Sequence, residues 1–145
     1  MRVLIQKVNQ ASVLVDEKLI SEIGKGLLVF VGIKADDSEK DSDYLINKIF
    51  NLRIFEDENF KMNKSVLDLN LEILLVSQFT LYADCKKGNR PSFINAMPPT
   101  QAKEFYSNFI EQFRKKYPKI QDGIFGAYMK INLINDGPVT IILDS

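Results

Sequence analysis

The chain has 145 residues, a formal net charge of zero and a hydrophobic fraction of 46%. These values predict one globular domain over residues 1–145, and they exclude a globally basic nucleic-acid binder, though not a local basic patch. The sequence contains no histidine and one cysteine, Cys85. Ser-His-Asp or Cys-His catalysis, a His-ligated metal and an intramolecular disulfide are therefore excluded.

No segment has the apolar length of a signal peptide or of a transmembrane helix. A single cysteine also fits a reducing compartment. We therefore expect a cytoplasmic protein without a membrane partner. The carboxylates show no EF-hand spacing, and we expect neither a metal nor a cofactor.

The first half of the chain predicts strands around one helix. Residues 2–16 are extended, with Asn9-Gln10 as a turn or bulge between two strands. Ser38 is a candidate N-cap for a helix over residues 39–51. Further strands are expected over residues 19–23, 27–31 and 52–55, and residues 60–66 are expected to be irregular.

The central stretch begins as a buried strand, because residues 73–76 form an unbroken apolar run. The polar pair Ser77-Gln78 falls where this strand should end or bulge, and residues 79–82 resume an extended pattern. A loop with Lys86, Lys87 and Arg90 follows. This arrangement predicts one wall of a site for an anionic substrate, and the alternative is a β-bulge followed by a solvated loop.

The second half predicts a helix from Pro98-Pro99 to Pro118, with an aromatic stripe that we interpret as core. Basic residues at its end, between 114 and 119, either complement the helix dipole or bind phosphate. Strands over residues 125–134 and 139–143 flank a tight turn. The sum is an α+β fold: a mixed or antiparallel sheet, curled into a barrel, with two helices packed on it.

The turn contains Gly137-Pro138, and an X-Pro bond can be cis at modest cost. A cis bond would turn two carbonyl oxygens to one side, where they could accept hydrogen bonds from an ammonium group. An ordinary hairpin turn is the alternative reading.

Three motifs in order resemble the D-aminoacyl-tRNA deacylase family, also called D-Tyr-tRNA deacylase. They are Ser77-Gln78-Phe79-Thr80-Leu81, Arg90-Pro91-Ser92-Phe93 and Asn135-Asp136-Gly137-Pro138-Val139-Thr140. The resemblance covers essentially the whole chain. Lys7 is a departure, because the family commonly has arginine there, and lysine lacks the planar fork.

The resemblance implies a homodimer that hydrolyses the ester of D-aminoacyl-tRNA, a proofreading reaction in translation. It implies that Gly137 and Pro138, joined by a cis bond, enter the neighbour's site, hold the α-ammonium and exclude L-residues. Ser77, Gln78, Phe79 and Thr80 would line the catalytic pocket. Glycine has no side chain to exclude, so glycine mischarged on tRNA-Ala is a second expected substrate.

Two mechanisms fit these residues. Thr80 could attack the ester, but no base is evident for it. We favour backbone N–H groups near Phe79 and Thr80 as oxyanion donors, with the 2′-OH of the tRNA assisting water. Lys86, Lys87 and Arg90 are expected to contact the tRNA, and we expect no DNA partner. The alternative functions are a non-catalytic RNA- or nucleotide-binding module and a hydrolase of D-amino-acid esters or peptides without tRNA.

Overall fold

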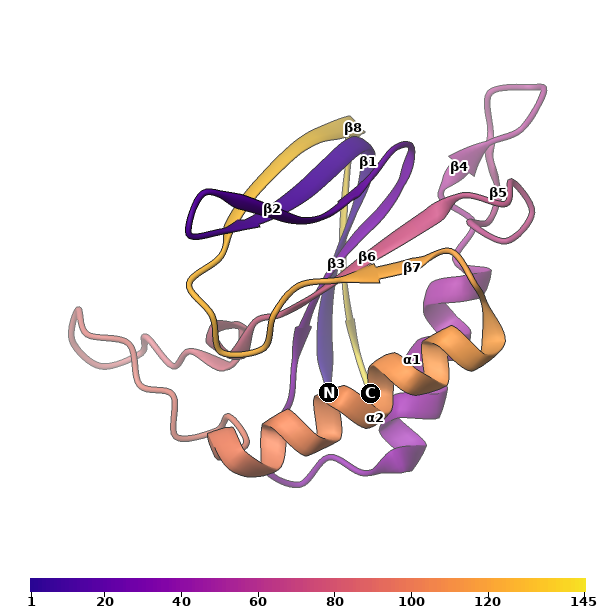
Figure 1. Ribbon diagram of the computed structural model, residues 1–145. Coiled ribbons are helices and arrows are strands. Elements are labelled where there is room, and N and C mark those ends of the chain that lie inside the picture. The colour runs from indigo at the N-terminus through magenta and orange to yellow at the C-terminus, as the bar shows by residue number, and fades with distance from the viewer.

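The computed structural model describes residues 1–145, and Figure 1 shows a curled sheet with two helices on one side. The strands are β1 (Arg2–Val15), β2 (Lys18–Ile23), β3 (Gly26–Gly32), β4 (Phe55–Glu56), β5 (Met62–Lys64), β6 (Glu72–Ser77), β7 (Ile120–Asp122) and β8 (Lys130–Asp144). The helices are α1 (Glu39–Asn51), α2 (Pro99–Lys116) and the 3₁₀ helix η1 (Phe79–Tyr82).

Six strands form one mixed sheet. β1 pairs antiparallel with β2 and β3 along one edge and with β8 along the other. β6 then lies parallel to β3, and β7 lies parallel to β6. Because β2 also contacts β6 and β7, the sheet curls into a nearly closed barrel. The α+β barrel expected from the sequence is thereby confirmed.

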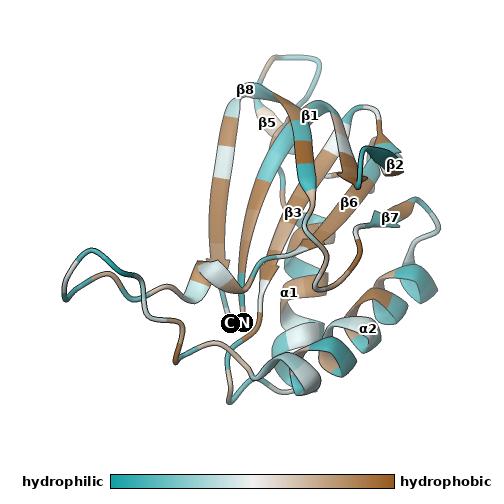
Figure 2. Ribbon diagram, turned by 60° about the vertical axis from the view of Figure 1, so that its left-hand side comes forward, coloured by the Kyte–Doolittle hydropathy of each residue, from teal (hydrophilic) through white to brown (hydrophobic).

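The helices cover one face of this sheet and bury the main core against it. α2 contributes Tyr106, Phe109, Ile110 and Phe113, and the rings of Phe109 and Phe113 meet edge to face at 5.0 Å. The interpretation of the aromatic stripe as core is confirmed. Figure 2 shows hydrophobic residues along β3 and β6 and hydrophilic residues on the outer side of α2. A smaller apolar cluster, including Val13, Leu28 and Leu74, lies apart from this main core.

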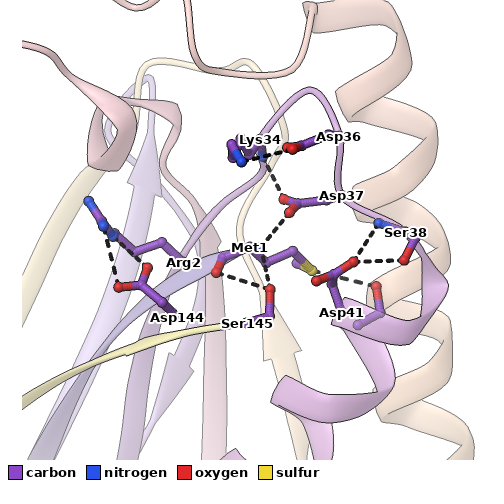
Figure 3. Close-up of polar contacts among 10 residues, drawn as sticks. Met1, Arg2, Lys34, Asp36, Asp37, Ser38, Asp41, Asp144 and Ser145 are labelled. Atoms are coloured by element: carbon purple, nitrogen blue, oxygen red, sulfur yellow. Dashed lines mark hydrogen bonds and ion pairs between the residues drawn. The ribbon is translucent and has the colours of Figure 1, made fainter.

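α1 begins where the sequence predicts. The Asp41 carboxylate accepts hydrogen bonds from the Ser38 N–H at 2.8 Å and from its hydroxyl at 2.7 Å (Figure 3). These bonds fix the entry into the helix and hold the pKa of Asp41 well below its usual range. Beside this cap, the α-amino group of Met1 pairs with Asp37 and donates to the Ser145 hydroxyl.

Of the two readings of residues 9–10, the bulge is confirmed, although it lies within one continuous strand: β1 runs through these residues, and its pairing with β8 shifts register between Val8 and Gln10. Several other predicted boundaries are wrong. Residues 135–138 are not a turn between two strands but lie within one long strand, β8, and residues 125–129 lie outside it. β4 begins at Phe55, and β5 crosses the segment expected to be irregular. No helix combines the length and apolarity needed to cross a membrane.

Candidate active site

The end of β6 supplies the first half of the candidate site. The Gln78 N–H donates to the Val31 carbonyl at 2.7 Å, and after this bond the chain leaves the sheet. Residues 79–82 form η1 instead of the predicted extended segment. The pairing partners explain this outcome, since β3 pairs with β6 only as far as Ser77. Without a neighbouring strand, the backbone makes i to i+3 bonds of its own.

η1 begins with two backbone donors that its own hydrogen bonds do not use. As the first residues of a 3₁₀ helix, Phe79 and Thr80 have N–H groups without an acceptor inside the helix. Both residues are exposed, whereas Ser77 and Gln78 are half-buried at the end of the strand. Such a helix start favours a negatively charged oxygen.

The Thr80 hydroxyl is hydrogen-bonded to the side chain of Gln78. The Gln78 side-chain amide donates a hydrogen bond to Thr80 Oγ1. An amide N–H cannot remove a proton, so this contact gives Thr80 no general base. No cluster of His, Cys, Asp or Glu side chains is placed to hold a metal ion.

Gly137 and Pro138 form the second half, within a bulged part of β8. The peptide bond between them is cis, and Gly137 has a φ of 118°. Both residues are exposed. A Cβ on Gly137 would lie 2.8 Å from Val139 Cγ2 and 3.2 Å from the Val139 nitrogen, so glycine is required on both conformational and steric grounds.

Neighbouring side chains hold this segment in place. The Lys7 ammonium lies 3.3 Å from an Asp136 carboxylate oxygen, and the Lys7 side chain is only 7% exposed. The Asn135 amide donates to the carbonyls of Lys7 and Val139, at 3.0 Å each. These contacts join the segment to Lys7 of β1, and the bond from Asn135 to Val139 joins its two ends.

The two halves lie far apart within one chain. Lys7, level with the bulge, pairs with Leu27 of β3, which in turn pairs with Ile73 of β6. Ser77 is four residues further along β6, about 13 Å at a rise of about 3.3 Å per residue. β8 and β6 are also separated by β1 and β3. One chain does not bring the predicted site residues together.

The basic loop adjoins the first half. Two backbone hydrogen bonds between Asp84 and Ser92 close its base, and Phe93 packs edge to face against Phe79 with ring centroids 4.9 Å apart. Figure 1 shows the segment between η1 and α2 extending away from the barrel. Lys86, Lys87 and Arg90 are exposed and make no ion pair.

The other basic cluster is mostly engaged within the chain. Arg114 pairs with Asp122, and Lys116 pairs with Asp43. Lys119 donates to a backbone carbonyl of Asn70. Of the two candidate phosphate-binding regions, the loop at 86–90 therefore has more free positive charge.

Comparison with known proteins assigns the chain to a family. A family model described as D-Tyr-tRNA(Tyr) deacylase matches residues 4–144. The chain belongs to this family and is a hydrolase of carboxylic esters. The ester that it hydrolyses is the bond between a D-amino acid and tRNA.

Individual relatives match along the whole chain. A D-aminoacyl-tRNA deacylase of Thermosipho melanesiensis is 55% identical and one of Thermotoga petrophila is 54% identical, each covering 100% of this chain and 97% of the relative. A solved structure described as c-Myc DNA unwinding element binding protein is 51% identical, with a TM-score of 0.96, over 100% of this chain and 99% of that one. A probable eukaryotic D-amino acid tRNA deacylase, 17% identical, shares the fold with a TM-score of 0.88 over 99% and 98%.

Sequence reasoning missed one group of residues at the site. Arg2 pairs with Asp144 and lies over the ring of Tyr82, the last residue of η1. Arg2 and Asp144 belong to opposite ends of the sequence, and neither lies in a motif. Only the antiparallel register, which pairs Arg2 with Asp144, brings them together.

Proposed function

We propose that two copies of this chain form the catalytic unit, and that Gly137 and Pro138 of one copy complete the strand-end site of the other. The observation that supports this is the separation of the two halves within a chain. Each half is exposed, and each alone could contact a substrate from one side only. A second copy supplies that partner.

Chirality is then selected by exclusion. The carbonyls of Gly137 and Pro138 accept hydrogen bonds from the substrate's α-ammonium group, while its ester carbonyl lies at η1. With these two groups fixed, a D-side chain points outward and an L-side chain meets the Gly137–Pro138 backbone. Glycine has no side chain to exclude, so glycine mischarged on tRNA-Ala is a second substrate of the same site.

Hydrolysis in this site needs no protein nucleophile. Water attacks the ester carbonyl carbon, and the N–H groups of Phe79 and Thr80 stabilise the oxyanion. The bond to the 3′-oxygen then breaks, and this oxygen takes up a proton. The neighbouring 2′-OH of the ribose positions or activates the water. The engagement of Thr80 by Gln78 favours this route over attack by Thr80.

The test is release of labelled amino acid from matched D-Tyr-tRNA and L-Tyr-tRNA. We expect rapid release from the D-form alone. Release from both would contradict the exclusion argument, and tRNA binding without release would indicate a binding module. A free D-tyrosine ester, assayed beside them, distinguishes a deacylase that needs tRNA from a general ester hydrolase.

Thr80→Ala is expected to keep substantial activity, with less than about a 10-fold loss in kcat. Removing one oxyanion donor typically costs more, about 10²–10³. The variant keeps the backbone N–H of residue 80 and loses only the hydroxyl. Single-turnover deacylation of D-Tyr-tRNA measures this. Complete loss of turnover, with binding and melting temperature intact, would instead indicate a catalytic hydroxyl.

Neutralising Lys86, Lys87 and Arg90 together is expected to raise KM for D-Tyr-tRNA and to leave kcat unchanged. Three lost phosphate contacts reduce the slope of log affinity against log salt by about 2–3. Neutralising Lys115, Lys116 and Lys119 is the matched control, and a larger effect there would move the tRNA path to the end of α2.

Competition by duplex DNA tests the expectation of no DNA partner, because the name of one solved relative refers to a DNA element. We expect little competition.

A further inference from the structure

Arg2, the first residue of β1, makes three kinds of contact around η1. Its Nε donates to Asp144 Oδ1 at 2.7 Å, and Nη2 donates to Oδ2 at 3.3 Å (Figure 3). Its Nη1 donates to the Leu81 carbonyl at 3.2 Å. The guanidinium carbon also lies 5.4 Å from the centre of the Tyr82 ring. Arg2 thus joins the paired ends of β1 and β8 to the last two residues of η1.

Gly32 forms the surface on which η1 rests. A Cβ at Gly32 would lie 3.0 Å from Leu81 Cβ and 3.3 Å from both Tyr82 Cδ2 and the Gln78 carbonyl oxygen. In the sheet, Arg2 is the register partner of Gly32. The end of β3 and the Arg2 side chain therefore both contact the same turn.

Besides these contacts and the packing of Phe79 against Phe93, few interactions hold η1 in place. It has four residues, none of them buried. Leu81 donates to Gln78 and Ala83 donates to Thr80, at 3.3 and 3.0 Å. A turn with so few internal bonds and no buried anchor depends on external contacts for its position.

The contribution of Arg2 to global stability is small. The side chains of Arg2 and Asp144 are 38% and 54% exposed, and exposed ion pairs contribute little to the free energy of unfolding. Its bond to Leu81 and its packing on Tyr82 instead act locally, on the turn that carries Phe79 and Thr80. A small displacement of a catalytic group has a large effect on rate.

We propose that Arg2, held by Asp144, is a positioning residue for the deacylase reaction: it fixes η1 so that the Phe79 and Thr80 N–H groups meet the developing oxyanion. This inference rests on the proposed function, because it assigns those N–H groups their role. In this role Arg2 acts through η1 and not by contacting the substrate.

The test compares Arg2→Ala with Arg53→Ala. Arg53 is a matched control, because it also donates to a backbone carbonyl, that of Asn63 at 2.8 Å, but on the β4–β5 hairpin. We expect Arg2→Ala to lower kcat for D-Tyr-tRNA about 10-fold with KM nearly unchanged. Arg2→Lys should restore little of it, since lysine cannot bond Asp144 and Leu81 with one planar group. Arg53→Ala should change neither parameter.

Hydrogen exchange of the Leu81 and Ala83 amides gives a readout that does not depend on turnover. Arg2→Ala should accelerate exchange at both amides, and Arg53→Ala should not. An unchanged kcat in an active protein, a higher KM alone, or a loss that simply follows the melting temperature would overturn the positioning role. If the wild-type protein releases no amino acid from D-Tyr-tRNA, the proposed function fails instead, whatever the exchange rates are, and the role assigned to Arg2 in the reaction fails with it.

Discussion

Gly137→Ala is expected to lower kcat/KM for D-Tyr-tRNA by about 10²-fold, the cost of misplacing reacting groups by about 1 Å. The new methyl group would lie 2.8 Å from Val139 Cγ2, and a φ of 118° is unfavourable for alanine. The segment must therefore shift, and the two carbonyls that we assign to the α-ammonium shift with it. Steady-state deacylation by the purified variant measures the loss.

Gly126→Ala is the matched control. Gly126 also has a positive φ, 77°, but a Cβ there meets nothing within 4 Å. This control separates the activity lost whenever alanine takes a positive φ from the activity lost because alanine stands at Gly137. Equal losses of activity in the two variants, or full activity in Gly137→Ala, would contradict the role proposed for Gly137.

Two variants that are each strongly impaired are expected to restore activity when combined in one dimer. Gly137→Ala alters the Gly137–Pro138 segment that one subunit contributes to the site of the other. Gly32→Val displaces η1 and so alters the strand-end part of the site in its own subunit. After random pairing, half of the two-fold dimers are mixed and each has one intact site, so about a quarter of wild-type activity returns. Co-expression with two affinity tags allows the mixed dimer to be isolated.

The complementation result separates a shared site from a site within one chain. If each chain carried a complete site, the mixture would be no more active than the sum of its parts. Sedimentation of the wild-type protein as a monomer at assay concentrations would also contradict the proposal. Circular dichroism of Gly32→Val checks that its defect is local.

The sequence predicts elements best where local chemistry determines them. Ser38 and the apolar spacing after it define α1, and the apolar run before Ser77 defines β6. The 3₁₀ turn of η1 could not be read in this way, because it depends on where the neighbouring β3 ends. The same holds for β8, where residues 135–138 suggest a turn but pairing with β1 continues on both sides.

The residues of the candidate site were predictable from the motifs, whereas their arrangement was expected only from the family resemblance. The motifs name Ser77, Thr80 and Gly137, but their order along the chain says nothing of the distance between them. That distance follows from the register of four strands. Lys7 is a similar case: the sequence shows a lysine where the family commonly has arginine, and only the structure pairs it with Asp136.

The outer edge of β8 has a consequence for aggregation. A strand of 15 residues that pairs only with β1 exposes a long row of backbone donors and acceptors, beside the exposed side chains of Ile134 and Ile142. Such edges attract strands from other chains. Pro138 has no N–H, and the bulge around it divides the edge into two short runs. The segment assigned to chiral selection therefore also interrupts the edge along which strands of other chains could pair.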